Sequence, residues 1–170
     1  TTIDTPVAVD VSGALIGKKV TAISANGSHT CAVADGKAYC WGSNTYGQIG
    51  DNTTTPSSLP VAVDMSGALS GKTVTDISVG NGFSCAVASG AVYCWGYNAN
   101  GRLGINSTTD SLVAVAVNTA GVLSGKTVTS ANTGNGANSN ACVVASGLGF
   151  CWGLNGDGEL GNGLSTQSLV

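Results

Sequence analysis

The stretch CAVADGKAYCWG at residues 31–42 decides the fold of this 170-residue chain. Its two cysteines lie nine residues apart, and Asp35 and Gly36 lie midway between them. An Asp-Gly pair is typical of the two-residue turn of a β-hairpin, because glycine tolerates a positive φ. Counting outward from this turn puts Cys31 opposite Cys40 in a pair that is not hydrogen-bonded, where side chains come closest. The stretch therefore predicts a hairpin whose two strands are joined by a disulfide.

The same stretch occurs three times in the chain. CAVASGAVYCWG starts at Cys85 and CVVASGLGFCWG at Cys142, so that the copies are 54 and 57 residues apart. The segments GALIGKKVT, GALSGKTVT and GVLSGKTVT precede the copies, and NTYGQIG, NANGRLG and NGDGELG follow them. The chain is thus one continuous repeat domain, which we divide into residues 1–54, 55–108 and 109–165, with 166–170 as the start of a next repeat.

Each repeat has the pattern of a small β-sheet. Residues 20–24 alternate apolar and polar side chains, as a half-buried strand does, and no segment has a sustained helical period. Roughly four short strands in each repeat, separated by turns, predict an all-β chain built of β-propeller blades. A β-solenoid is the main alternative, but its coils repeat after about 20–30 residues or fewer.

Three blades are too few to form a ring, because propellers close with about 4–8 blades. We expect the three blades to be part of a larger propeller or of one that further copies of the chain complete. An open filament is the third outcome, because head-to-tail contacts propagate when they do not close.

The six cysteines form three pairs with the same separation: Cys31 with Cys40, Cys85 with Cys94, and Cys142 with Cys151. We predict one disulfide in each pair. Free buried thiols are the alternative, and a metal site is disfavoured because the short Cys-x-x-Cys spacing is absent. Disulfides persist in oxidising surroundings, so we expect an extracellular or cell-surface protein.

Composition argues against several classes of function. Six Lys and Arg against nine Asp and Glu give a net charge of −3, which disfavours a nucleic-acid partner. The chain has no apolar run of about 18 residues, so no membrane span is expected. His29 is the only histidine, and we predict a hydrogen-bonded structural role for it. Because no nucleophile, base and carboxylate form a recognisable cluster, we expect no enzyme, no cofactor and no metal.

Two segments are similar to ligand loops without matching them. GALSGKT at 67–73 has three residues before its Gly-Lys pair where a phosphate-binding loop has four. NGDGE at 155–159 lacks the spacing of a calcium-binding EF-hand loop, and the corresponding segments of the other repeats are NTYGQ and NANGR. We interpret both segments as turns of the repeat.

Residues 20–52 resemble the repeat of the regulator of chromosome condensation family. The likeness rests on the Trp-Gly pair at 41–42 and on the Asn-x-x-Gly-Gln-Leu-Gly pattern at 44–50, which return in the other two repeats. The departures are Phe83 and Asn140 at the family's histidine position, and Arg102 and Glu159 at the position of Gln48. The resemblance implies a β-propeller, commonly of seven blades, and is strongest with the cysteine-containing repeats of secreted bacterial proteins. Family members act as exchange factors for a small GTPase, as chromatin binders and as protein inhibitors of β-lactamases.

Positions that break the repeat are the best candidates for binding specificity, because the scaffold does not require them. These candidates are Tyr46, Tyr97, Arg102, Phe83 and the 129–142 loop. We hypothesise a non-enzymatic extracellular module for protein–protein interaction, adhesion or surface assembly, with a protein or further copies of the chain as partner. The alternatives are an inhibitor or exchange-factor-like binder of a protein, and a structural subunit of an extracellular filament.

Overall fold

The computed structural model describes residues 5–136 and 139–170, which fold into three antiparallel sheets. The first sheet consists, in order, of β1 (Val20–Asn26), β2 (His29–Ala34), β3 (Lys37–Gly42) and β4 (Ser57–Ala62). The second consists of β5 (Val74–Val79), β6 (Phe83–Ala88), β7 (Ala91–Gly96) and β8 (Ser111–Ala116). The third consists of β9 (Val128–Thr133), β10 (Asn140–Ala145) and β11 (Leu148–Gly153). No residue in the described part of the chain is helical, which confirms the all-β prediction.

The central hairpin of each sheet has the predicted register. Cys31 pairs with Cys40, and both residues of the turn, Asp35 and Gly36, have a positive φ. The other two hairpins have the same turn, formed by Ser89 with Gly90 and by Ser146 with Gly147. All three predicted disulfides are present, and none of the six cysteines is free. The alternatives of free thiols and of a thiolate metal site are thereby excluded.

The fourth strand of the first and of the second sheet comes from the next repeat of the sequence. Gly42 pairs with Ser57 and Gly96 with Ser111, in each case across a boundary between our sequence repeats. Gly153 forms an isolated bridge with Ser168 at the corresponding position of the third sheet. Each of the first two sheets is thus completed by a strand that follows a long loop, and this strand joins consecutive repeats by hydrogen bonds.

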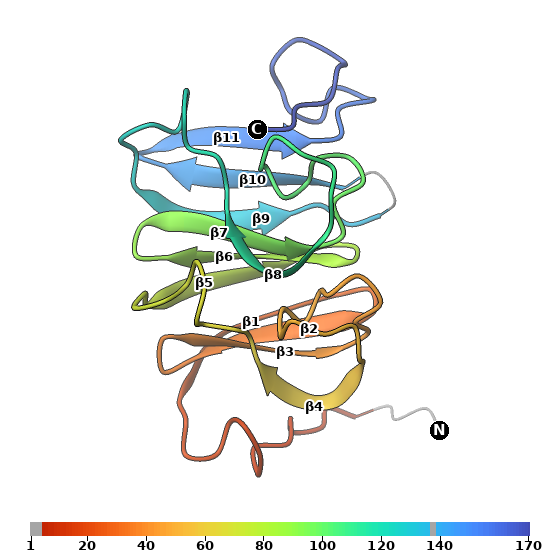
Figure 1. Ribbon diagram of the computed structural model, residues 1–170, viewed down its shortest axis with the longest axis vertical. Coiled ribbons are helices and arrows are strands. Elements are labelled where there is room, and N and C mark those ends of the chain that lie inside the picture. Colours follow the sequence, from red (N-terminus) through yellow and green to blue (C-terminus); the bar gives the residue numbers. More distant parts are fainter. Residues whose placement is uncertain (1–4, 137–138) are drawn as a thin grey trace.

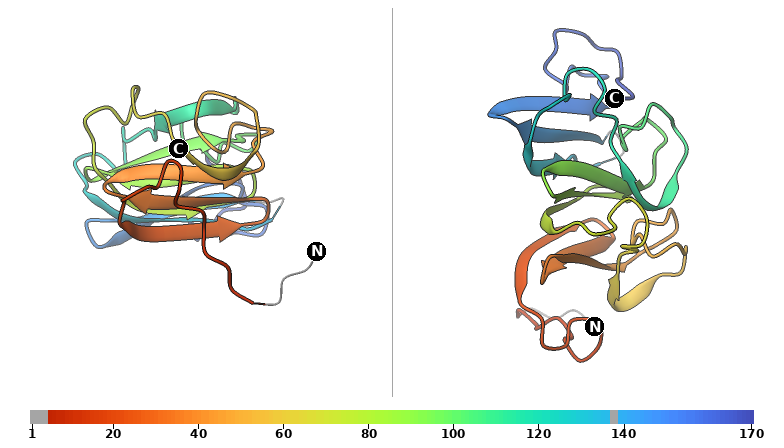
Figure 2. Two further views of the ribbon diagram at one scale, coloured as in Figure 1. Left: turned by 90° about the horizontal axis from the view of Figure 1, so that it is seen from below. Right: turned by 60° about the vertical axis from the view of Figure 1, so that its left-hand side comes forward.

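The three sheets pack face to face along the chain. Figure 1 shows the first sheet at the bottom and the third at the top, and in the view from below (Figure 2, left) the first sheet lies in front. The innermost strands β1, β5 and β9 are neighbours, and the Val79 amide donates to Ser24 Oγ at 3.1 Å, as the Thr133 amide does to Ser78 Oγ at 3.0 Å. These contacts set the spacing between blades.

Apolar side chains fill both spaces between the sheets. Val33 and Ile49 of the first repeat pack with Ile77 and Trp95 of the second. Between the second and third sheets the core contains Phe83, Val87, Leu103, Val143 and Trp152. Because each sheet is apolar on both faces, every blade needs a neighbour on each side, as propeller blades do.

Candidate protein-binding site

A buried asparagine shapes the long loop between the third and fourth strands of each blade. The amide of Ile49 donates to Asn44 Oδ1 at 2.9 Å, and Asn44 Nδ2 donates to the carbonyls of Thr53 and Thr55 at 3.0 and 3.1 Å. The same bonds recur at Asn98 and Asn155. We call residues 44–50, 98–104 and 155–161 the Asn loops. The repeated motif noted in the sequence is therefore a loop whose shape three hydrogen bonds of one side chain determine.

Each of the first two Asn loops packs against the tryptophan of the next blade. Trp95 Nε1 donates to the Gln48 carbonyl at 2.9 Å, and Trp152 Nε1 donates to the Arg102 carbonyl at 3.0 Å. A Cβ at Gly50 would lie only 2.7 Å from Trp95 Nε1, so this position needs glycine. The tryptophans at these two positions are fully buried and join consecutive blades.

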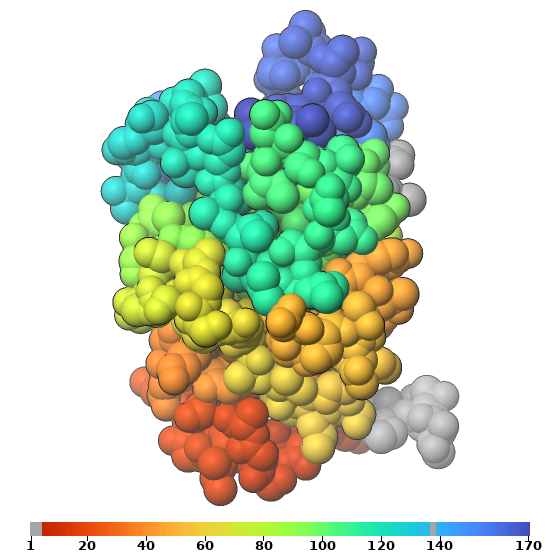
Figure 3. All heavy atoms as spheres, viewed as in Figure 1, coloured from red at the N-terminus to blue at the C-terminus, as the bar shows by residue number. Residues whose placement is uncertain are grey.

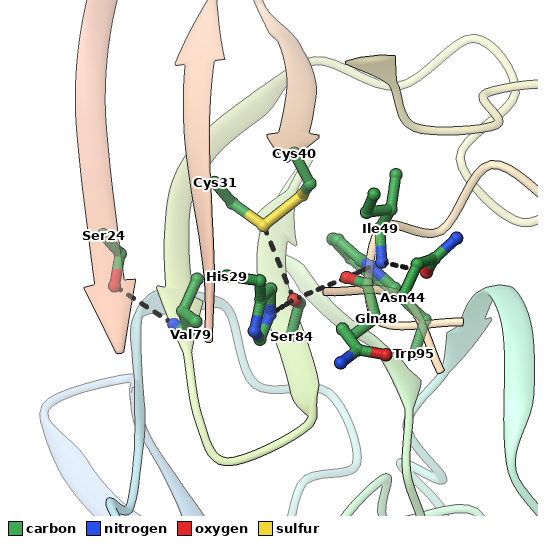
Figure 4. Close-up of a disulfide and its surroundings, with 10 residues drawn as sticks. All are labelled: Ser24, His29, Cys31, Cys40, Asn44, Gln48, Ile49, Val79, Ser84 and Trp95. Atoms are coloured by element: carbon green, nitrogen blue, oxygen red, sulfur yellow. Dashed lines mark hydrogen bonds between the residues drawn. A yellow bond between two sulfur atoms is a disulfide. The ribbon is translucent and has the colours of Figure 1, made fainter. Parts of the chain in front are cut away.

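His29 belongs to the same contact between the first two blades (Figure 4). Its Nε2 lies 2.8 Å from Ser84 Oγ, and Ser84 Oγ donates to the Gln48 carbonyl at 3.0 Å. Because the single hydroxyl proton of Ser84 is used in that bond, we assign the proton of the neutral imidazole to Nε2. The structural role predicted for His29 is confirmed, whereas Ser84 and Gln48 were not identified from the sequence.

Burial lowers the pKa of His29 from 6.5 to about 4. The ring is 3% exposed, and no described residue bonds its Nδ1. Protonation would therefore place a positive charge in the blade interface without a partner for the added proton.

We expect acid to destabilise the protein through His29. His29 binds a proton near pH 6.5 in the unfolded chain and only near pH 4 in the folded chain. The contribution of neutral His29 to the free energy of unfolding is therefore complete above pH 6.5 and falls as the pH falls towards 4. The difference between the two pKa values corresponds to about 3 kcal/mol in the free energy of unfolding. Urea unfolding between pH 4 and 7 measures this loss of stability. The third repeat has an asparagine, Asn140, at the position of His29, so His29→Asn is the matched substitution and is expected to remove this part of the pH dependence. Parallel stability curves for the two proteins would contradict the assignment.

The four single residues that break the repeat come together in one column. The ring centres of Tyr46 and Tyr97 are 4.4 Å apart. Arg102 Cζ lies 4.6 Å from the centre of the Tyr97 ring and 5.7 Å from the centre of the Phe83 ring. Tyr46 comes from the first Asn loop and crosses to the second blade over Gly82, where a Cβ would lie 3.3 Å from its ring. The column therefore spans the joint between two blades.

Only the two tyrosines of this column are accessible. Tyr46 is 42% exposed and Tyr97 is half-buried, whereas Phe83 and Arg102 are buried beneath them. Burial lowers the pKa of Arg102, while Tyr97 and Asp110 act in the opposite direction. A guanidinium against an aromatic face gains cation–π attraction, which holds the Tyr97 ring in place. We call Tyr46 and Tyr97 the tyrosine pair.

The remaining candidate, the predicted 129–142 loop, is only partly a loop. Residues 129–133 belong to β9 and residues 140–142 to β10, because the strand pattern of the repeat continues into both ends of this segment. The connection between the two strands is residues 134–139, of which 137–138 fall outside the described residues. Within residues 5–136 and 139–170, no three His, Cys, Asp or Glu side chains form a group suited to a metal ion. The described part of the chain also contains no helix that could span a membrane.

Several known proteins are similar to this chain in sequence or in structure. The human E3 ubiquitin-protein ligase HERC2 is 29% identical over 170 residues, which cover 99% of this chain and 3% of the ligase. The crystal structure of human WBSCR16 matches 93% of this chain and 40% of its own, with 25% identity and a TM-score of 0.75. Prp20p from Saccharomyces cerevisiae matches 89% of this chain and 37% of its own, with 17% identity and a TM-score of 0.72. The chain thus spans less than half of each of these proteins.

The family assignment rests on the repeats themselves. The profile of the Regulator of chromosome condensation (RCC1) repeat matches residues 35–87 and 89–136, and a second profile of that repeat matches 20–48 and 74–102. The matched segments contain the disulfide hairpins of the first two blades and their Asn loops. The three sheets are accordingly propeller blades, and the chain belongs to the RCC1 repeat family.

Proposed function

We propose that this chain is a non-enzymatic propeller module that binds a protein partner through the tyrosine pair. The observation that carries the proposal is the exposed Tyr46–Tyr97 contact, 4.4 Å between ring centres, on a buried support of Arg102 and Phe83. Tyrosine is enriched in protein interfaces, because it offers a large rigid apolar surface and a polar hydroxyl. Preorganisation by the support lowers the entropy lost on binding.

Two further observations support this function. Prp20p, which has the same fold, has reported binding properties to Gsp1p and histones, so propellers of this type are used to bind proteins. The three cystines support a location outside the cell or on its surface, where disulfides persist. Adhesion and surface assembly are the uses that fit a protein-binding module in that location.

The test identifies the partner by photo-crosslinking and then measures its affinity. A benzophenone amino acid at position 46 is expected to crosslink an extracellular protein, and the same probe at the exposed position 59 on β4 serves as control. With the purified partner, Tyr46→Ala combined with Tyr97→Ala is expected to weaken binding about 30-fold or more, whereas Leu59→Ala leaves it unchanged.

Two results would contradict the proposal. Equal affinity of the double tyrosine variant and the wild-type protein would exclude the tyrosine pair as the contact surface. A change in the intact mass of the partner after incubation with the chain would exclude a non-enzymatic role.

A further inference from the structure

The accessible charge on the loops around the tyrosine pair is negative. These loops, residues 43–56 and 97–110, contain three charged side chains. Asp51 is half-buried and Asp110 is exposed, whereas Arg102 is buried. Figure 3 shows the two loops (orange and green) next to one another on the right-hand side of the molecule, as the contact between the two tyrosine rings requires. A partner that reaches the tyrosine pair therefore meets carboxylates beside it.

The lysines of the chain lie at the opposite ends of the strands. Lys18 and Lys19 precede β1 and Lys37 begins β3, so these three surround the first hairpin turn. Lys72 and Lys126 precede β5 and β9. Because consecutive strands are antiparallel, the hairpin turns and the loops around the tyrosine pair lie at opposite ends of the sheets. In Figure 3 the segments that contain Lys72 (yellow) and Lys126 (teal) accordingly lie on the left. The tyrosine pair thus lies on the face opposite the lysines.

Asp51 lies close to Tyr46 because both are held on the start of β8. The amide of Asn52, the residue after Asp51, donates to the Leu112 carbonyl at 3.1 Å. Gly47, the residue after Tyr46, packs on the same leucine, and a Cβ there would lie 2.8 Å from Leu112 Cα. The first loop therefore presents a carboxylate and an aromatic ring close together.

Asp110 lies close to Tyr97 for a similar reason. Its Oδ1 accepts from the backbone amide of Asn98, the residue after Tyr97, at 2.7 Å. Neither aspartate belongs to the repeated pattern. The other repeats have Ile105 and Asn162 at the position of Asp51, and Pro56 and Gln167 at the position of Asp110. Two negative charges that the scaffold does not require therefore flank the tyrosine pair.

A guanidinium is the group that suits an aromatic pair flanked by carboxylates. Aromatic faces attract cations, and carboxylates accept the N–H groups of a guanidinium in pairs. Arginine makes both contacts better than lysine, because its planar group stacks on rings and presents several donors in one plane. Arg102 shows that this site accommodates such stacking, since its Cζ lies 4.6 Å from the centre of the Tyr97 ring.

We propose that the tyrosine pair binds an arginine within a basic segment of the partner protein. The guanidinium stacks on the exposed ring of Tyr46, and the carboxylates of Asp51 and Asp110 attract it and the basic residues beside it. This inference rests on the proposed function and specifies the chemistry of the partner. An acidic segment would be repelled by the same two carboxylates, and an uncharged segment would gain nothing from them.

The first test uses a labelled, end-capped peptide of glycine and serine that contains two arginines. Its control is the same peptide with citrulline in place of both arginines, because citrulline has nearly the same shape without the charge. Fluorescence anisotropy at low salt is expected to show binding of the arginine peptide and at least about 10-fold weaker binding of the citrulline peptide. Salt is expected to weaken only the binding of the arginine peptide, because it screens charge.

Asp51→Asn tests the role of the carboxylate without changing the loop. The third repeat has Asn162 at this position, and Asn162 Oδ1 accepts from the Leu164 amide as Asp51 Oδ1 does from the Thr53 amide. The substitution is expected to weaken binding of the arginine peptide about 5-fold and to leave the citrulline peptide unaffected.

Asp35→Ser is the matched control, because it removes the same charge at the hairpin-turn end of the first sheet. The second repeat has Ser89 at this position, and Ser89 Oγ accepts from the Thr73 amide as Asp35 Oδ1 does from the Lys19 amide. This variant is expected to bind the arginine peptide as the wild type does. Circular dichroism of both variants checks that the fold is intact.

Tyr46→Leu separates cation–π attraction from apolar contact, because leucine keeps an apolar side chain and removes the ring. It is expected to weaken binding of the arginine peptide about 10-fold. Unchanged binding by this variant, equal binding of the two peptides, no binding of the arginine peptide, or equal losses in Asp51→Asn and Asp35→Ser would each overturn the inference.

The partner identified by crosslinking separates a failure of this inference from a failure of the proposed function. If the double tyrosine variant loses affinity for that partner and Asp51→Asn does not, the tyrosine pair is the contact surface but its ligand is not basic. If neither variant loses affinity, the proposed function fails together with the inference. A loss in both variants, with Asp35→Ser unchanged, is the result that we expect.

Discussion

Gly96→Ala is expected to destabilise the protein by about 4 kcal/mol or more, enough to unfold the blade that contains it. Gly96 has a φ of +99°, which L side chains rarely adopt, and its Cβ would lie 2.5 Å from the Gly82 carbonyl oxygen and 2.9 Å from Phe83 Cα. Both contacts are with backbone atoms of the neighbouring strand and its turn, so relief requires breaking the β6–β7 pairing next to the Trp95 joint. Urea unfolding monitored by tryptophan fluorescence measures the loss.

Gly149→Ala is the matched control for this substitution. Gly149 lies in β11, a Cβ there would meet nothing within 4 Å, and the other two repeats have Ala38 and Val92 at the same position. The control is expected to leave stability unchanged or raise it slightly, because alanine loses less backbone entropy on folding than glycine. Equal stability of the Gly96 and Gly149 variants would refute the proposed steric cause.

Asn98→Asp is expected to cost about 4 kcal/mol although it changes one atom of the side chain. The fully buried Asn98 donates from Nδ2 to the carbonyls of Ser107 and Thr109, both at 2.9 Å. A carboxylate at position 98 would direct an oxygen at both carbonyl oxygens. It would also lie near the carboxylate of Asp110, which accepts a hydrogen bond from the backbone amide of Asn98 at 2.7 Å. The bond from the Leu103 backbone amide to Oδ1 would remain, so the loss comes from the two donor bonds and from the added negative charge near Asp110.

The same chemical change at Asn118 is the control. The Ala120 amide donates to Asn118 Oδ1, and the first and second repeats have aspartate at this position, Asp10 and Asp64, with the same local bond. Asn118→Asp is therefore expected to be neutral within about 0.5 kcal/mol. If both variants lost the same stability, the shape of the loop would not depend on the Asn98 bonds.

Local interactions explain why the hairpins and their disulfides could be predicted from the sequence. A two-residue turn such as Asp35–Gly36 determines the pairing of every residue on both sides of it, so counting was enough to place Cys31 opposite Cys40. The exact recurrence of the motif then assigned the same structure to the other two repeats. The family likeness arose from the same local residues, the Trp-Gly pair and the Asn loops.

The contacts between blades could be found only in the tertiary structure. The partners of His29 and of Trp95 lie far along the chain, and which side chains meet depends on how one sheet is placed on the next. The sequence therefore identified Tyr46, Tyr97, Arg102 and Phe83 as unusual but did not show that they form one column, with the first two accessible and the others buried. The burial of the repeated tryptophans has the same origin, because a residue's burial in a repeat protein depends on the neighbouring repeat that packs on it as well as on its own sequence: Trp95 and Trp152 are buried by the Asn loops that precede them.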